Sequence, residues 1–174
     1  MNAQRGQKMK ETSGLYYEDL AVGQKFHSGT YEMTAEKIKA FAAEWDPQPF
    51  HMDEAKAKDS LFQGLAASGW HTAAATMRLM VDSDMKLAGG SIGAGGEELR
   101  WPQPTRPGDV LKLEIEVLEM RESRSRTDLG IVKTRLTTTN QRDEVLQVSR
   151  PTLMVRRRGG ALGPARGGDA RGGS

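Results

Sequence analysis

Apolar and polar residues recur with two different periods along this chain, one typical of helices and one typical of strands. An apolar residue every three or four positions from Ile38 to Trp45 predicts a helix that begins after Thr34, whose hydroxyl can act as the N-cap. A second stripe with the same spacing predicts a buried central helix over residues 70–81. Its members are Trp70, Ala73, Ala74, Met77 and Val81.

The later part of the chain changes to the period of two that is typical of strands. Residues 110–119 alternate strictly, with Leu111, Leu113, Ile115 and Val117 on one side. Residues 25–33, 127–138 and 144–156 are also predicted strands, and Pro151 predicts that the last is an edge strand or carries a bulge. The order of elements predicts an α+β fold in which a single antiparallel sheet wraps around a central helix.

Composition supports one folded domain over about residues 15–157. The chain has 174 residues, of which 37% are hydrophobic and 20 are glycine, a normal share for a globular core. Residues 1–14 and the glycine- and arginine-rich residues 158–174 contain little to bury, so a flexible N-terminus and a disordered tail are expected. The absence of cysteine excludes disulfides, a thiolate nucleophile and cysteine-ligated zinc.

The charge of the chain is uneven, and its distribution argues against a nucleic-acid partner. Five arginines against Asp169 give residues 156–174 a charge of +4, which leaves −2 of the total +2 for residues 1–155. A solvated tail is the expected interpretation, although an RNA contact by the tail is an alternative. The sequence contains neither an apolar run typical of a membrane span nor a secretory signal, so a cytoplasmic location is expected.

The most distinctive local motif is Asp46-Pro47-Gln48-Pro49-Phe50-His51. Two prolines predict a stiff, extended loop that holds a carboxylate and an imidazole close together, and a small polar helix capped by Asp53 should follow. Asp and His can share one water molecule, because one accepts its proton while the other orients it. The same spacing also fits a simple helix exit, in which Asp46 bonds backbone amides and His51 packs against the core.

A second motif marks the start of the predicted central helix. Ser68 is a suitable N-cap, and Gly69 would have an amide without an intrahelical partner. Such an amide, aligned with the helix dipole, can polarise a carbonyl and stabilise an enolate. The alternative is that Gly69 only allows the helix to pack closely.

Together these motifs resemble the MaoC-like dehydratases, or (R)-specific enoyl-CoA hydratases, over about residues 15–157. The family motif of Asp, any residue, Asn, Pro, any residue and His is matched by Asp46, Pro49 and His51, while Gln48 replaces the asparagine, as in a recognisable subgroup. Three further segments match: Leu20-Ala21-Val22-Gly23-Gln24, Ala67-Ser68-Gly69 and Arg106-Pro107-Gly108-Asp109.

The resemblance implies a hot-dog fold and a hydro-lyase. The implied reaction adds water to the 2,3 double bond of a trans-2-enoyl-CoA thioester, or removes it, with an (R)-3-hydroxyacyl-CoA as the hydrated form. Asp46 and His51 are the implied catalytic residues, and Gly69 with Ser68 is the implied site for the thioester oxygen. Where relatives have a serine on the central helix this chain has Met77, to which no site role is assigned.

The resemblance also implies partners. The expected small molecule is an enoyl-CoA, so coenzyme A is part of the substrate, and neither a cofactor nor a metal is expected. Arg100 and Arg106 are candidates for contacts with the coenzyme A phosphates, with a purely solubilising role as the alternative. A homodimer, or a higher even homo-oligomer, is expected because paired sheets would close the acyl tunnel.

Two other functions compete with the hydratase interpretation. A hot-dog acyl-CoA thioesterase would act on the same substrates, but many use a carboxylate on the central helix, and residues 70–81 contain none. A non-catalytic acyl-binding module would not need Asp46 and His51. A phosphate loop at residues 89–96 is rejected, because no Lys-Ser or Lys-Thr follows and two glutamates do.

The remaining histidines and tryptophans are expected to be structural. His27 and His71 lack the spacing of metal ligands, and His71 is close enough to Gly69 in sequence to border the site. Trp45, Trp70 and Trp101 are expected in the core or in the lining of the substrate groove.

Overall fold

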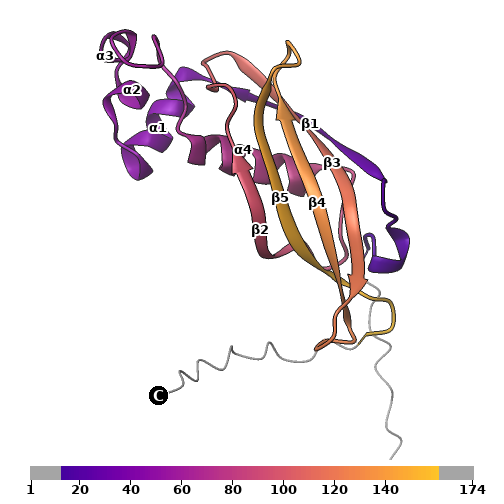
Figure 1. Ribbon diagram of the computed structural model, residues 1–174. Coiled ribbons are helices and arrows are strands. Elements are labelled where there is room, and N and C mark those ends of the chain that lie inside the picture. The colour runs from indigo at the N-terminus through magenta and orange to yellow at the C-terminus, as the bar shows by residue number, and fades with distance from the viewer. Residues whose placement is uncertain (1–12, 161–174) are drawn as a thin grey trace, which may run out of the picture.

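The alternating segments form one antiparallel sheet in the computed structural model, which describes residues 13–160 (Figure 1). The elements in chain order are η1 (Tyr17–Asp19), β1 (Lys25–Met33), α1 (Ala35–Trp45), α2 (Pro49–Met52), α3 (Glu54–Lys58), α4 (Gly69–Asp82), β2 (Ile92–Arg100), β3 (Asp109–Glu122), β4 (Leu129–Thr139) and β5 (Val145–Arg156).

The strand order β1-β3-β4-β5-β2 places the first two strands of the chain on opposite edges of the sheet. Strand β3, which lies between β1 and β4, shows the predicted alternation, since Leu111, Leu113, Ile115 and Val117 are all buried. β1 pairs with β3 from Lys25 opposite Glu116 to Met33 opposite Asp109, with an irregularity between His27 and Thr30. The sheet therefore presents one continuous apolar face.

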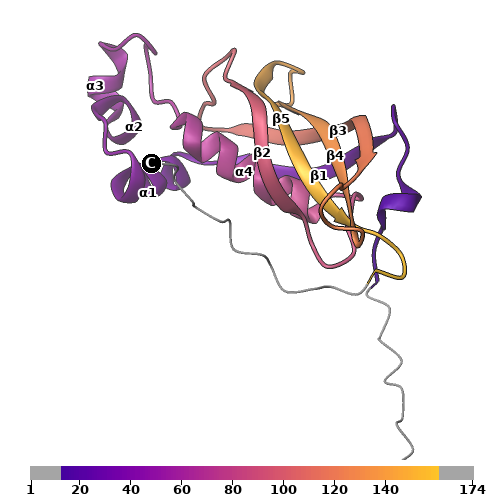
Figure 2. The ribbon, with the colours of Figure 1, turned by 60° about the horizontal axis from the view of Figure 1, so that its bottom comes forward.

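Helix α4 lies against the concave side of this sheet, and the main core is the layer between them (Figure 2). Two buried hydroxyl pairs join the helix to its surroundings, Thr72 with Thr105 at 2.9 Å and Thr76 with Thr138 at 2.8 Å. The pairs satisfy polar atoms that would otherwise be costly to bury. The arrangement confirms the predicted α+β class, in which an antiparallel sheet wraps around a central helix.

The face that α4 turns toward the sheet differs from the predicted one. Trp70, Met77 and Val81 of the predicted stripe are 63%, 54% and 58% exposed, whereas Ala75, Leu79 and Met80 are buried together with the two threonines and His71. Small and hydroxyl-bearing side chains let the helix approach the sheet closely and still form hydrogen bonds. The bulky apolar stripe is consequently left on the outer surface.

Three shorter helices gather beyond the N-terminus of α4 (Figure 1). α1 begins as predicted, because the Thr34 hydroxyl accepts from Lys37 N at 3.3 Å, and Ile38 and Ala42 are buried. Trp45 is 68% exposed at the last residue of the helix, so its expected place in the core or groove was wrong. The helix ends there because the chain turns away at Asp46.

Residues 46–51 are only half extended, which corrects the predicted loop. Pro49 is the first residue of α2, where a missing amide hydrogen costs nothing, and only the preceding residues up to Gln48 are non-helical. The small polar helix that follows is confirmed as α3, with the Asp53 carboxylate accepting from Ala55 N and Lys56 N at 2.8 and 3.0 Å. The turn of helix at Pro49 brings His51 back toward Asp46.

Pro151 lies in β5, which pairs with both β4 and β2 and is not an edge strand. The edge alternative was therefore wrong, and the bulge alternative is confirmed. The pairing of β2 with β5 shifts register on both sides of Gly96 opposite Pro151. The irregularity accommodates a residue that cannot donate to a neighbouring strand.

The predicted segments 1–14 and 158–174 lie mostly outside the described residues. At the described boundary, the Arg158 guanidinium donates to both carboxylate oxygens of Asp19, at 2.5 and 2.6 Å. Over residues 13–160, no helix is long and apolar enough to cross a membrane.

Buried His71 makes the stability of this fold sensitive to pH. Its ring stacks on Phe41 with centroids 4.6 Å apart, and its Nδ1 has no hydrogen-bond partner among the described residues. Burial, with a smaller effect of Lys37, lowers the pKa of His71 from 6.5 to about 4. The unfolded chain therefore binds the proton more readily than the folded chain between these two values, and stability falls as the pH falls through that window.

We expect the free energy of unfolding to drop by ~1–2 kcal/mol more in the wild type than in His71→Phe between about pH 7.5 and pH 5. Phenylalanine keeps the stacking on Phe41 and removes the titrating group. Urea denaturation at both pH values measures the difference. Equal drops in the two proteins would contradict this role of His71.

Candidate active site

A pocket of about 640 Å³ opens where the short helices meet the N-terminus of α4. It is formed by the end of α1, by α2, by the segment before α4 and by the chain between β2 and β3. Its lining residues are Asp46, Gln48, Phe50, His51, Leu61, Phe62, Ala67, Ser68, Gly69, Trp70, Trp101, Pro102, Gln103, Pro104 and Arg106. The structure thus brings most of the predicted site residues together, with Arg100 outside this lining.

Asp46 is held by hydrogen bonds from both sides. Gln48 Nε2 donates to Asp46 Oδ1 at 2.7 Å, so this glutamine orients the carboxylate. The Ser68 hydroxyl also donates to this carboxylate, and it is the largest of the effects that lower the pKa of Asp46, followed by Gln48 and by His51. Asp46 is therefore ionised at neutral pH, and its side chain is 21% exposed to the pocket.

His51 is oriented by a backbone carbonyl. Its Nδ1 lies 2.7 Å from Ala66 O, and its side chain is only 5% exposed. Phe50 and Phe62 flank the ring, with centroids 4.5 and 6.0 Å from that of His51. Because a carbonyl can only accept, Nδ1 must carry the hydrogen, and Nε2 of the neutral ring keeps its lone pair.

The two side chains meet at His51 Nε2 and Asp46 Oδ2, which are 3.4 Å apart. With Nδ1 donating to Ala66, both facing atoms are acceptors, so a bridging water molecule could donate one hydrogen to each. Such a water is oriented and made more nucleophilic at once. The arrangement favours the shared-water hypothesis over the simple helix exit.

Ser68 and Gly69 form the N-terminus of α4, as predicted. The Ser68 hydroxyl accepts from Trp70 N at 3.3 Å and donates to Asp46, so it both caps the helix and positions the carboxylate. As the first residue of a helix that spans Gly69–Asp82, Gly69 has an amide without an intrahelical acceptor, and it lines the pocket. The positive end of the helix dipole thus lies beside the Asp46 carboxylate.

The two candidate arginines occupy different positions. Arg106 Nη1 donates to Gly64 O and Leu65 O at 2.9 and 3.2 Å, and its Nη2 donates to Phe62 O. Arg106 therefore fastens the segment that carries Ala66. Arg100 pairs with Glu98 at the end of β2.

Sequence reasoning missed the parts of the site that depend on backbone atoms. Ala66 gives no signal in the sequence, because it acts through its carbonyl. One sequence feature could have pointed to Ala66. It directly precedes the predicted helix start at Ala67-Ser68-Gly69, so its carbonyl lies close to the site along the chain.

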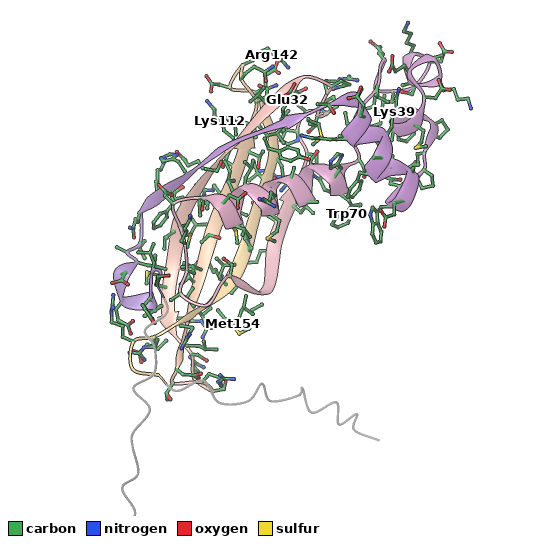
Figure 3. All side chains as sticks on the ribbon, turned by 180° about the vertical axis from the view of Figure 1, so that it is seen from behind. Glu32, Lys39, Trp70, Lys112, Arg142 and Met154 are labelled. Atoms are coloured by element: carbon green, nitrogen blue, oxygen red, sulfur yellow. The ribbon has the colours of Figure 1, made fainter. Side chains whose placement is uncertain are left out.

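The expected positions of the other aromatic and imidazole residues are partly confirmed. Trp70 and Trp101 line the pocket, and Figure 3 shows Trp70 at the end of α4 that lies near the short helices. His71 faces Phe41, and His27 is exposed, so neither lines this pocket. Across residues 13–160, no group of three or more His, Cys, Asp or Glu side chains is placed to hold a metal ion.

Comparison with known proteins places this chain and its fold in a family. A family model for a MaoC-like domain matches residues 19–140. A crystal structure of the MaoC-like dehydratase from Rhodospirillum rubrum is 58% identical, covers 83% of this chain and 99% of its own, and gives a TM-score of 0.81. The uncharacterised Bacillus subtilis protein YdeM is 31% identical over 142 residues, 80% of this chain and 98% of its own. The chain belongs to the MaoC-like domain family, and its fold is the hot-dog fold.

More distant solved structures have names that specify an activity. The (R)-hydratase PhaJ1 from Pseudomonas aeruginosa, in the unliganded form, is 25% identical with a TM-score of 0.66, covering 91% of this chain and 100% of its own. The (R)-hydratase from A. caviae involved in PHA biosynthesis is 26% identical with a TM-score of 0.65, covering 78% of this chain and 97% of its own.

Gly69 allows an unusually close approach at the site, which a stability measurement can test. A Cβ atom at Gly69 would lie 2.8 Å from atoms of the Trp101 indole, whereas one at Gly93 would meet nothing within 4 Å. We expect Gly69→Ala to lower the free energy of unfolding by ~1–3 kcal/mol through overpacking. The matched Gly93→Ala should change it by less than ~0.5 kcal/mol in the same urea titration. Equal effects would show that the contact with Trp101 is not tight.

Proposed function

We propose that the protein is a hydro-lyase that adds water to the 2,3 double bond of a trans-2-enoyl-CoA, or removes it from an (R)-3-hydroxyacyl-CoA. The observation that carries the proposal is the pair of acceptors, Asp46 Oδ2 and His51 Nε2, 3.4 Å apart in a pocket that Gly69 also lines. Membership of the MaoC-like family and the likeness to two (R)-hydratases support the same reaction.

In the hydration direction, the water oxygen forms a bond to the third carbon while one of its protons passes to the Asp46–His51 pair. The electrons of the double bond move onto the thioester, whose oxygen becomes an enolate and accepts a hydrogen bond from Gly69 N. A proton from the pair is then returned to the second carbon as the enolate collapses. Because the pair lies on one side of the substrate, the hydroxyl and the proton are added to the same face.

The ionised state of Asp46 suits this role. Donors on Ser68 and Gln48 keep the carboxylate an acceptor, while Phe50 and Phe62 flank the buried His51 ring. No step of the reaction needs a metal or a separate cofactor. The (R) configuration of the product and the binding of coenzyme A phosphates by Arg100 or Arg106 stay predictions.

The thioesterase alternative has less support. Helix α4 carries no carboxylate between Trp70 and Val81, so the nucleophile or base common in hot-dog thioesterases is missing from that position. An acyl-binding module without catalysis would not need an acceptor pair oriented by three hydrogen-bonding groups, Gln48 and Ser68 for Asp46 and Ala66 O for His51.

We also propose that the protein acts as a homodimer. The outer stripe of α4, with Trp70, Met77 and Val81, is apolar and exposed, and the adjacent strand β2 is an exposed sheet edge. A second copy can cover both features at once, because a two-fold axis brings the same stripe and the same edge together.

Hydration of crotonyl-CoA tests the catalytic proposal. We expect the wild type to remove the ultraviolet absorbance of the conjugated enoyl group, and Asp46→Asn and His51→Ala each to lower kcat by about 10²–10⁴-fold, the usual contribution of a general acid or base. Asp59→Asn and His27→Ala are matched controls on exposed residues outside the pocket, and both should keep wild-type rates.

Two outcomes would contradict the proposal. Release of free coenzyme A thiol would identify a thioesterase. A wild type that is inert with short, long and branched enoyl-CoA substrates would favour acyl binding. A stereospecific 3-hydroxyacyl-CoA dehydrogenase distinguishes an (R) from an (S) product.

The dimer is tested by sedimentation velocity. We expect a species of twice the 19.1 kDa chain mass at micromolar concentration. Val81→Arg should shift it toward the monomer, because an arginine buried at a two-fold interface faces its own copy. Val22→Arg, at a residue 64% exposed and distant from α4 in the sequence, should leave the dimer intact. A monomeric wild type would overturn this part of the proposal.

A further inference from the structure

A second pocket continues along α4 from the candidate active site. It has a volume of about 170 Å³ and lies between the next turns of the helix and strands β2, β4 and β5. Ala73, Met77 and Met80 line it from the helix, and Leu99 and Leu153 line it from the sheet. Its lining is mainly apolar, which suits a hydrocarbon chain.

The Trp101 indole connects the linings of the two pockets through a hydrogen bond. Trp101 lines the active-site pocket, while Gln147, which accepts from Trp101 Nε1 at 2.8 Å, lines the second pocket. The indole also packs edge to face on Trp70, with centroids 5.7 Å apart, and against Gly69. Gln147 is 2% exposed, so the hydrogen bond is held from the protein interior.

These contacts fix the indole across the direction in which an acyl chain would extend. A thioester whose oxygen faces Gly69 N places its second and third carbons near Asp46 and His51, and the rest of the chain must continue past Trp101. The second pocket is the apolar space next along both α4 and the sheet. Trp101 is 39% exposed, so its contacts with Gln147 and Trp70 hold the ring in place more than burial does.

We propose that the hydrogen bond between Trp101 and Gln147 determines the acyl chain length that the enzyme accepts. This inference rests on the proposed hydratase function. With the bond formed, the indole separates the pockets and short enoyl chains are preferred. Without it, longer chains reach the second pocket and gain the burial of each additional methylene. Trp101 is thus a specificity-determining residue.

The expected effect is a change in the relative kcat/KM for long and short enoyl-CoA substrates. Full burial of one methylene is worth about fourfold in affinity, so a chain longer by several methylenes gains at least ~10-fold even if it is only partly buried. We expect Trp101→Phe, which keeps an aromatic ring but removes the donor, to raise the decenoyl-CoA to crotonyl-CoA ratio of kcat/KM by at least ~10-fold. Gln147→Leu removes the acceptor at nearly constant volume and should shift the ratio in the same direction.

A control variant and a double variant test whether the effect is specific to Trp101 and to the second pocket. Trp45→Phe makes the same substitution at a tryptophan that lines neither pocket and should leave the ratio unchanged. Adding Ala73→Leu to Trp101→Phe fills the second pocket and should return the ratio toward the wild-type value. The dissociation constants of saturated decanoyl-CoA and butanoyl-CoA, measured by calorimetry, should change in the same sense.

The outcomes separate this inference from the function on which it rests. A wild type that hydrates no enoyl-CoA contradicts the proposed function, and the ratio of the two dissociation constants then decides whether Trp101 controls chain length. An active wild type with no preference for crotonyl-CoA, or variants with an unchanged ratio in both measurements, would overturn the role of Trp101 and Gln147.

Discussion

The hydrogen bond between His51 Nδ1 and Ala66 O is the interaction on which the rest of the site depends. It selects the tautomer of a buried imidazole, and so it decides that Nε2 faces Asp46 as an acceptor. It also ties α2 to the segment that leads into α4. That segment is held in turn by Ala67 N donating to Thr105 O and by Arg106 donating to Phe62 O, Gly64 O and Leu65 O. The acid, the base and the helix N-terminus are therefore fixed relative to one another by the Gln48 and Ser68 side chains on Asp46 and by these contacts to backbone carbonyls.

Different parts of helix α4 contribute to packing of the core and to the candidate active site. Its inner face packs Thr72, Ala75 and Thr76 together with Leu79 and Met80 against the sheet, and its N-terminus offers Gly69 N to the pocket. Its outer face keeps an apolar stripe exposed. A helix with only an apolar inner face would pack as well, but it would offer neither a surface for a second copy nor an apolar pocket beyond the active site.

The sequence predicted where helices and strands begin better than it predicted which side of helix α4 faces the sheet. The strict alternation of β3, the Thr34 and Asp53 caps and the helix start at Ser68-Gly69 follow from local chemistry, and the structure confirms them. Apolar spacing alone gave the wrong inner face for α4. Spacing shows that one side of a helix is apolar, but it does not show whether that side meets the sheet or another surface.

By itself, the sequence determined the α+β architecture, the caps of α1, α3 and α4 and the pairing of Asp46 with His51 in one motif, because caps and residue periods act over a few positions. Only the tertiary structure decided the tautomer of His51, the fastening role of Arg106 and the hydrogen bond of Trp101 to Gln147. Each of these depends on a partner far away in the chain, such as Ala66 for His51 or Gln147 for Trp101. Backbone carbonyls and buried amides become specific partners only when the fold brings them within hydrogen-bond distance.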